Sequence, residues 1–340
     1  MIKIKNLQIQ SNLFLAPLAG YTNLPFRIAI RQNGRVGLTV SELVNARSLI
    51  EKKQKAFQLV EICDQDRPVA SQIFGAKKEE MAEAARILDE IGFDVIDLNM
   101  GCPVRKVVAT GAGAALLTDL KKAVSIAAEV VKATSKPVTV KIRLGWDDSS
   151  IIAPELAKAL EDAGIAAVTV HGRTRAQGFS GPVRLDQIKR VVDSVKTIPI
   201  IANGNIVSPE SAKEMFEQTG CSGISIGRGA FYDPWIFYRT QEFLNNGKVP
   251  SPPTMLDRLE FIKRHLRLMV AHFGEKRGCI MFRKVVHLEV KGLNIASEFR
   301  RQTSNISSLA EFEQMIGRFI GIAGKSVAKE YTCCCDSNLG

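Results

Sequence analysis

Short apolar runs alternate along this chain with longer segments in which apolar residues recur at helical spacing. The runs are rich in Val, Ile and Leu, which is typical of strands. A segment long enough to form a helix follows each run, and this alternation favours a parallel sheet built from strand–helix units. Eight such units fit a closed (β/α)8 TIM barrel, within the α/β class, better than an open doubly wound sheet. The runs are Leu13–Leu18, Leu38–Leu43, Val69–Phe74, Val95–Asn99, Val138–Leu144, Ala167–Val170, Pro199–Ala202 and Gly223–Ile226.

The segments between the runs carry helix signals of their own. Lys77–Ile91 places apolar residues on one helical face, and Asp119–Ala133 and Pro154–Ala163 show the same pattern. Glycines follow three of the segments, where a helix C-cap favours a left-handed backbone. They are Gly92, Gly164 and Gly220. The connections are therefore short, and the barrel is predicted to close near Phe243.

The pattern changes after residue 245. Residues 246–254 concentrate Pro and Ser and predict a linker. Beyond them the spacing is helical only, with an apolar stripe from Leu259 to Phe273 and further helices predicted near Cys279–Lys291 and Leu309–Ile320. The predicted division is 1–245 for the barrel domain, 246–254 for the linker, 255–325 for a small all-helical C-terminal domain and 326–340 for a flexible tail.

Composition narrows the class of protein. Hydrophobic residues make up 46% and charged residues 24% of the 340 residues, as in ordinary globular proteins. No apolar run approaches the roughly 20 residues that cross a bilayer, and the N-terminus lacks a signal-peptide pattern. We therefore expect a cytoplasmic protein with no membrane partner. The seven cysteines form no CxxC pair or His-containing metal spacing, so we expect reduced thiols and no metal.

Positive charge is concentrated in the predicted helical domain. The whole chain carries a net charge of +11, and Leu256–Arg301 holds eleven Lys or Arg residues against five Asp or Glu residues. A solvated helix surface usually mixes the two signs. The excess therefore favours a surface that faces the phosphates of a nucleic acid.

Polar residues stand at the carboxyl ends of nearly all the predicted strands, where barrels of this kind carry their reactive groups. Lys141 costs free energy when it is buried unless an anion meets it. The last two runs end in glycine-containing turns, and barrels often bind phosphate after strands seven and eight. These features predict a phosphorylated cofactor. The strand-end residues are Pro17 with Gly20, Glu42, Gln72, Asn99 with Cys102, Lys141 with Arg143, His171 with Arg173, Asn203 with Gly204, and Gly227 with Arg228.

Two further segments contrast in what they predict. Cys102 stands on a Gly-Cys-Pro corner just beyond the fourth run, where a role in chemistry explains a cysteine better than packing inside the run does. The GAGA string at Gly111–Ala114 follows no strand and lacks a third glycine, so a dinucleotide-binding fingerprint is not expected there.

Seven longer motifs are distributed along the chain. They are LAPLAGYTNLPFR (15–27), DLNMGCPVRKV (97–107), GAGAALL (111–117), VKIRLGWDD (140–148), VHGRTRAQGFSGP (170–182), ANGNI (202–206) and GRGAFYDPWIF (227–237). In these motifs, and from about Leu13 to Phe319, the chain resembles the flavin-dependent tRNA-dihydrouridine synthases, most closely their bacterial B-type branch. The Asn-x-Gly-Cys-Pro string is quite specific, whereas the glycine turns would also suit other flavin barrels.

The resemblance implies an FMN-binding barrel, a helical tRNA-binding domain and NADPH as the reductant, with Cys102 as the proton donor. The implied substrate-binding residues are Asn99, Arg143 and Arg173 in the barrel and Arg283, Lys284 and Lys291 in a helix similar to the family's tRNA-contacting helix. The implied cofactor residues are Ala16, Pro17 and Leu18 beside the isoalloxazine, Gln72 and Lys141 at its edge, His171 near the reacting base, and Asn203, Gly204, Asn205, Gly227 and Arg228 at the phosphate.

The implied reaction reduces specific uridines in the D-loop region of tRNA to 5,6-dihydrouridine. Hydride passes from reduced FMN to C6 and a proton from Cys102 to C5, and NADPH regenerates the reduced flavin. A thiol suits the role because it is mostly protonated at neutral pH and yet acidic enough to donate. Lys141 near the flavin would stabilise its anionic reduced form. The base must leave the RNA stack to reach the barrel.

Three positions depart from the family's pattern. Tyr21 stands where a small aliphatic residue is more usual, Asn205 replaces a more usual Asp, and Val183–Ile188 lacks the usual Trp. Tyr21 and the missing Trp affect the expected shape of the substrate entrance and leave the expected chemistry unchanged.

Two other functions compete with this one. A flavin oxidoreductase of a free pyrimidine, similar to dihydroorotate or dihydropyrimidine dehydrogenases, is disfavoured because a small substrate needs no basic domain. An RNA-binding barrel without catalysis is disfavoured because every expected cofactor position is filled. We expect a monomer. The sequence leaves open which uridine is modified and whether the RNA is tRNA or another structured RNA.

Overall fold

The computed structural model describes residues 1–335, with side chains described up to Ala323. The chain forms two compact units. The first comprises Met1–Ala230 with Ile236–Val249, and the second comprises Phe231–Trp235 with the chain from Pro250 onward. The chain leaves the first unit at Val249, a position inside the predicted linker. The membership of Phe231–Trp235 in the second unit has no signal in the sequence pattern.

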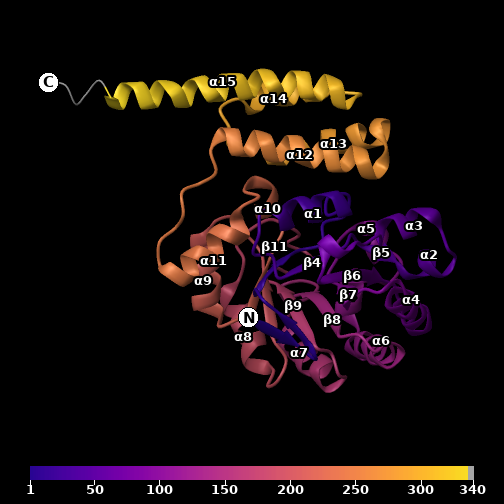
Figure 1. The fold of residues 1–340 in the computed structure, drawn as a ribbon. Coiled ribbons are helices and arrows are strands. Elements are labelled where there is room, and N and C mark those ends of the chain that lie inside the picture. The colour runs from indigo at the N-terminus through magenta and orange to yellow at the C-terminus, as the bar shows by residue number, and fades with distance from the viewer. Residues whose placement is uncertain (336–340) are drawn as a thin grey trace. The chain divides into compact units, whose positions relative to one another are not determined.

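Eight parallel strands close into a barrel in the first unit (Figure 1). The ring closes because β3 pairs with both β11 and β4, and β4 pairs with β6. The predicted (β/α)8 barrel is therefore confirmed. A two-residue strand, β5 (Val44–Asn45), pairs with β6 as an addition to the ring. The barrel strands are β3 (Leu13–Leu15), β4 (Leu38–Val40), β6 (Val69–Phe74), β7 (Val95–Met100), β8 (Val138–Arg143), β9 (Ala167–His171), β10 (Ile200–Asn203) and β11 (Gly223–Ile226).

The first two barrel strands are shorter than the predicted runs Leu13–Leu18 and Leu38–Leu43. Pro17 lacks the N–H that a strand residue would donate to its neighbour. Beyond it the N–H of Gly20 donates to the carboxylate of Glu42. Both strand ends therefore become loops, joined to each other at the carboxyl end of the barrel, which we call the mouth.

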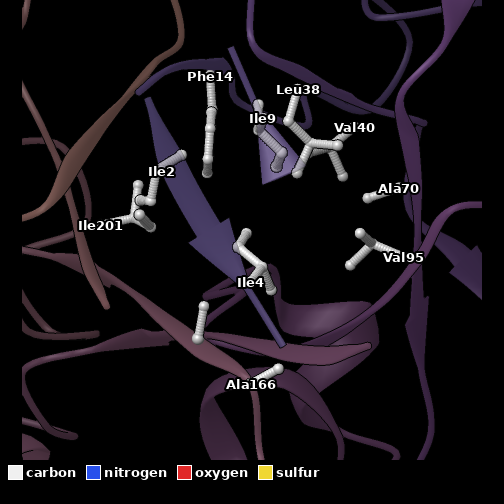
Figure 2. Close-up of a cluster of buried hydrophobic side chains, with 11 residues drawn as sticks. Ile2, Ile4, Ile9, Phe14, Leu38, Val40, Ala70, Val95, Ala166 and Ile201 are labelled. Carbon is white, nitrogen blue, oxygen red and sulfur yellow. The ribbon is translucent and has the colours of Figure 1, made fainter. Parts of the chain in front are cut away.

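An antiparallel hairpin of β1 (Ile2–Ile4) and β2 (Leu7–Ile9) packs against the opposite, amino end of the barrel. Figure 2 shows its isoleucines facing apolar side chains from the first residues of several barrel strands. Each such side chain, when buried, contributes about 1.5–3 kcal/mol. The pattern of the first nine residues does not predict this hairpin. Its cluster comprises Ile2, Ile4, Ile9, Phe14, Leu38, Val40, Ala70, Val95, Ala166, Ala167 and Ile201.

Helices surround the barrel (Figure 1), and the three predicted ones lie within one residue of their expected bounds. Gly92 and Gly220 cap α4 and α9 with φ of 96° and 66°, and Gly164 follows α7 with φ of 87°. The longer helices are α1 (Leu24–Gln32), α4 (Lys78–Ile91), α6 (Leu120–Ala133), α7 (Ala153–Asp162), α8 (Leu185–Ser194), α9 (Pro209–Thr219) and α11 (Ile236–Asn246). The short ones are α2 (Ala46–Ile50), α3 (Gln54–Leu59), η1 (Asp64–Asp66), α5 (Arg105–Val108), η2 (Gly113–Thr118) and α10 (Gly229–Tyr232).

The second unit is helical. Its helices are α12 (Met255–Phe273), α13 (Glu275–Glu289), α14 (Ala296–Thr303) and α15 (Leu309–Cys335). A reciprocal capping box between Thr254 and Asp257 begins α12, and rings of α12 to α15 pack edge to face around Phe282 and Phe312. The pattern does not predict the short α14. The segment Leu309–Cys335 contains no proline, and α15 continues to Cys335, into the segment predicted as a flexible tail. Residues 336–340 and the side chains of Cys333, Cys334 and Cys335 lie outside the described part.

No helix within residues 1–335 combines the length and the apolar character needed to cross a membrane.

Candidate active site

Parallel pairing brings the predicted strand-end residues to one level at the mouth. Asn99 of β7 lies opposite Lys141 of β8, and His171 of β9 lies opposite Asn203 of β10. Arg143, two residues beyond Lys141, lies opposite His171. Because successive strands of a parallel barrel end on the same side, four neighbouring strands present these side chains together.

Lys141 on β8 is held by a residue of β10. Its Nζ donates to Asn203 Oδ1 at 2.9 Å, and Asn203 Nδ2 donates to the carbonyl of Ser225 at 2.7 Å. Burial, followed by the charge of Arg143, lowers the pKa of Lys141 to about 8, and the charge of Asp97 opposes this shift in part. A buried ammonium with a depressed pKa is stabilised by an added anion. The position therefore fits the anionic edge or the phosphate of a ligand.

The Cys102 thiol lies on a turn held by Asn99. Asn99 Oδ1 accepts the backbone N–H of Gly101 at 3.2 Å and that of Cys102 at 2.9 Å. Burial raises the pKa of Cys102, and the N–H of Val104 and the charges of Arg143 and Lys141 oppose this only in part. The thiol is therefore protonated at neutral pH, the form that a proton donor requires.

Residues of the GAGA string contact the backbone of the Cys102 turn. Gly113 has φ of 60°, and a Cβ added to it would lie 2.8 Å from the Cys102 carbonyl oxygen and 3.2 Å from Cys102 Cβ. The N–H of Ala114 donates to the same carbonyl at 3.0 Å. The glycine is needed for close approach to the Cys102 turn, which gives the string a structural reason other than dinucleotide binding.

Two predicted substrate-binding arginines hold a loop at the mouth. Arg143 donates to the carbonyls of Thr174 and Gly178 at 2.9 and 2.7 Å. Arg173 donates from Nη2 to the carbonyl of Gly181 at 2.6 Å and to Asn205 Oδ1 at 3.1 Å. The loop between β9 and α8 is therefore shaped by charged side chains, and substrate contacts by these arginines stay a prediction.

His171 lies among cations. It is 6% exposed, and Arg173 Nη1 lies 3.4 Å from its Nε2. Burial, followed by the charges of Lys141 and Arg143, lowers the pKa of His171 to about 2. The imidazole is therefore neutral at neutral pH, and a neutral imidazole has one hydrogen-bond donor and one acceptor.

The turn after β10 has two residues with positive φ, and one of them is a glycine at a position with no room for a side chain. Gly204 has φ of 131° and Asn205 has φ of 52°. A Cβ on Gly204 would lie 2.8 Å from Val183 Cγ2 and 3.1 Å from His171 Cδ2. Asparagine tolerates the left-handed region, which accommodates the departure at Asn205. Val183, from the segment that lacks a Trp, packs against this turn.

The turn after β11 lies beside the predicted isoalloxazine residues. The N–H of Ala16 donates to the carbonyl of Ile226 at 2.9 Å. A Cβ on Gly227 would lie 3.8 Å from Ala16 Cβ and 3.8 Å from Leu18 Cδ1. Pro17 lines the same internal cavity as Lys141. The residues predicted for one ligand from separate strands are thus gathered at the mouth, and their cations fit a phosphorylated, anionic cofactor.

Comparison with known proteins decides the family. The sequence model of the Dihydrouridine synthase (Dus) family matches residues 14–321. The chain belongs to the dihydrouridine synthase family. The resemblance inferred from the motifs is therefore confirmed.

Named relatives extend over nearly the whole chain. A probable tRNA-dihydrouridine synthase of Rickettsia conorii is 38% identical over 94% of this chain and 96% of its own length. The tRNA-dihydrouridine synthase B of Pasteurella multocida is 37% identical over 91% of this chain and 93% of its own length. A member with the B-type name is thus among the relatives, as the resemblance implied.

Solved structures share the barrel fold at low sequence identity. Morphinone reductase in complex with tetrahydroNAD matches with a TM-score of 0.51 and 14% identity, covering 74% of this chain and 91% of that one. The 6-hydroxypseudooxynicotine amine oxidase of Pseudomonas geniculata matches with a TM-score of 0.56 and 12% identity, covering 78% of this chain and 52% of that one. These likenesses support the fold.

One aromatic side chain at the mouth of this family member is not among the residues predicted from the sequence. Phe179 is 60% exposed. The guanidinium carbons of Arg143 and Arg228 lie 5.4 and 5.3 Å from the centre of its ring, and the His171 ring lies 6.2 Å away. A lone aromatic residue in a Gly- and Ser-rich loop is the available signal, but only the fold places it against three strand ends.

The predicted tRNA-contacting residues of the second unit differ in their surroundings. Arg283 donates from Nε and Nη2 to the carbonyl of Ile306 at 3.0 and 2.7 Å. Lys291 Nζ lies 4.0 Å from the centre of the Tyr232 ring, and Lys284 is exposed on α13. Arg283 therefore ties α13 to the loop between α14 and α15, whereas Lys284 and Lys291 are both exposed.

Within the part of the chain that the structure describes, no group of three or more His, Cys, Asp or Glu side chains is arranged to hold a metal ion.

Proposed function

We propose that this protein reduces uridine in tRNA to 5,6-dihydrouridine, with FMN as the bound cofactor and NADPH as the reductant. Membership of the dihydrouridine synthase family supports the reaction, as do the relatives named tRNA-dihydrouridine synthase. The choice of FMN and NADPH rests on the resemblance and on the chemistry of the mouth.

The single observation that carries the proposal is the Cys102 thiol at the carboxyl end of a barrel strand, on a turn whose backbone N–H groups donate to Asn99. Burial raises the pKa of this thiol, which favours its protonated form. The chemistry that reduced FMN would supply when bound is a hydride for uracil C6. C5 would then develop enolate character and need a proton, and Cys102 holds one at its Sγ. A positioned general acid typically accelerates such a step by about 100- to 10,000-fold.

The residues of the mouth fit the flavin. Lys141 carries a half-buried charge that an anionic ring edge would stabilise. The turns at Gly204 and Gly227, with Arg228, offer small residues and a guanidinium to a phosphate. Neutral His171 lies between these two regions and can bind a ligand carbonyl without adding a further charge. Ala16, Pro17 and Leu18 supply an apolar wall.

Transfer RNA is favoured over a free pyrimidine by the second unit. The excess of basic residues in Leu256–Arg301 suits a phosphate backbone, and a free base would leave it without a role. Lys284→Ala should weaken tRNA binding and reduce the salt dependence of the binding constant by about one phosphate contact. Arg283→Ala should instead lower the stability of the unit.

Mass-spectrometric mapping of dihydrouridine in RNA from cells with and without the gene tests the function. We expect dihydrouridine to disappear from one or more tRNA positions when the gene is deleted and to return with the wild-type gene. A complementary assay with purified protein compares tRNA with free uracil and dihydroorotate. Turnover of the free pyrimidines without RNA, together with unchanged tRNA, would replace this proposal with the alternative oxidoreductase.

A further inference from the structure

A series of hydrogen bonds links a buried carboxylate to the Cys102 turn. Asp97 on β7 is 5% exposed, and none of the roles above uses it. Its Oδ2 accepts from Gln72 Nε2 at 2.7 Å, and Gln72 Oε1 accepts from Asn99 Nδ2 at 2.8 Å. Asn99 Oδ1 in turn accepts the backbone N–H of Cys102 at 2.9 Å. Three side chains therefore connect the interior of the barrel to the backbone that carries the thiol.

The two ends of this series fix the orientation of both amides. Asp97 Oδ2 accepts from Gln72, so the NH2 group of Gln72 faces Asp97 and its carbonyl faces Asn99. The backbone N–H groups at the turn can only donate, so Asn99 must direct its carbonyl toward them. Flipping either amide would bring donor against donor or acceptor against carboxylate, at the cost of buried unpaired groups.

The surroundings of Asp97 complete the arrangement. Its second oxygen, Oδ1, accepts from Thr139 Oγ1 at 2.6 Å. Burial raises the pKa of Asp97, and the donors Thr139 and Gln72 and the charge of Lys141 oppose that rise. Parallel pairing puts Gln72, Asp97 and Thr139 at one level of the barrel, one layer below Asn99 and Lys141. The carboxylate therefore lies beneath the mouth.

We propose that Asp97 is a positioning residue for Cys102. It holds the NH2 group of Gln72, Gln72 holds Asn99, and Asn99 holds the Gly101-Cys102 turn from which the thiol projects. Without the carboxylate the Gln72 amide can rotate, Asn99 loses a fixed partner, and the turn moves more freely. Asp97 thereby acts through two amides on the geometry of the proton donor.

Three substitutions separate positioning from ordinary packing. Asp97→Leu keeps a similar volume and removes both acceptors. Asp97→Asn keeps one acceptor for Gln72, and its NH2 group can donate to the Thr139 hydroxyl, which can rotate to accept. Thr139→Val is the matched control, since it removes a hydrogen bond from the same carboxylate and leaves the connection to Gln72 intact.

The readout is the alkylation rate of Cys102 by iodoacetamide, measured by peptide mass spectrometry on the full-length protein, with Cys63 as an internal reference. Asp97→Leu should accelerate alkylation of Cys102 by about 3- to 10-fold, the effect of losing one net hydrogen bond that holds the turn. Asp97→Asn and Thr139→Val should stay within about twofold of the wild type. If Asp97→Leu does not fold, Gln72→Leu breaks the same series and should give the same acceleration.

A double substitution completes the test. Asn99→Ala should accelerate alkylation on its own, and adding Asp97→Leu should change the rate no further, because both act through one series. Additive accelerations, or equal effects of Asp97→Leu and Thr139→Val, would overturn the proposal. The catalytic meaning of the inference rests on the proposed function, but alkylation needs no RNA. A wild type that forms no dihydrouridine would therefore reject the function and leave the positioning result standing.

Discussion

The two ends of the barrel are built from the same strands but differ in what their side chains bury. The amino end buries apolar groups, and the mouth holds charged groups. At the amino end, Ile4 of the hairpin packs with Ile201 of β10 among apolar side chains. Two residues further along β10, Asn203 holds the half-buried ammonium of Lys141 at the mouth. The first end gains free energy by removing apolar surface from water. The second end loses part of that gain by holding charges out of water, where they can act on a ligand.

The largest expected effect comes from removing the charge at the mouth. Lys141→Met should lower dihydrouridine formation by about 100- to 1000-fold, because a preorganised charge is lost where negative charge develops. Thermal unfolding should show equal or higher stability, since the partly desolvated ammonium is gone. Lys158→Met, on the exposed face of α7, is the control and should change neither quantity. A strong loss of stability in Lys141→Met would contradict the contrast between the two ends.

At the amino end the opposite pattern is expected. Ile4→Ala should lower the free energy of unfolding by about 2–4 kcal/mol because it leaves a cavity in a buried cluster. The activity per folded molecule should stay unchanged. Lys3→Ala, on the exposed side of the same strand, should alter neither, and urea unfolding measures both variants. Loss of specific activity in Ile4→Ala without loss of stability would show that the amino end contributes to activity, and would contradict the contrast between the two ends.

The pH dependence of stability should also distinguish the ends. The folded protein holds the pKa of Lys141 at about 8, below that of an unfolded lysine, so between these values the unfolded chain binds more protons. The stability contributed by this site should therefore rise as pH rises above about 8, by about 1–2 kcal/mol once the remaining solvent exposure of the side chain is allowed for.

That rise should be absent in Lys141→Met and retained in Ile4→Ala. Unfolding titrations of the three proteins between neutral and alkaline pH measure it. Identical slopes in the wild type and in Lys141→Met would show that the charge at the mouth contributes nothing to stability.

The smallest expected effect concerns the loop over the mouth. Phe179→Ala should lower the free energy of unfolding by about 0.5–1 kcal/mol, the usual contribution of a partly exposed ring beside guanidinium groups. Phe179→Tyr should retain it because the ring remains. Equal losses in the two variants, measured by urea unfolding, would show that the loop is held by the arginine–carbonyl hydrogen bonds alone.

The sequence predicts the mouth better than the amino end. Polar residues interrupt the apolar runs at strand ends, and this interruption singles out Lys141 and Asn203 from the pattern alone. The β1–β2 hairpin escapes prediction because three-residue strands are too short to show a period. The barrel itself follows from counting runs, since eight strand–helix units leave few other closed arrangements.

Within the site, residue types are predictable and their partners are not. Cys102 and Asn99 come from one motif, but the hydrogen bond between Asn99 and Gln72 joins residues 27 positions apart and depends on strand order. From the sequence alone, Asp97 is only a polar residue within a predicted buried strand. Only the pairing of β6, β7 and β8 shows that it holds Gln72. The sequence predicts that Arg143 binds the substrate. The structure shows that it also donates hydrogen bonds to carbonyls of the loop between β9 and α8.

The most direct test of the central claim is the dihydrouridine yield of Cys102→Ala on unmodified tRNA, measured by mass spectrometry beside Cys63→Ala as the matched cysteine control. Cys102→Ala should keep its yellow flavin and oxidise NADPH slowly, while product formation falls by about 100-fold or more. Cys63→Ala should match the wild type. A Cys102→Ala protein that forms dihydrouridine at the wild-type rate would contradict the assignment of this thiol as the proton donor.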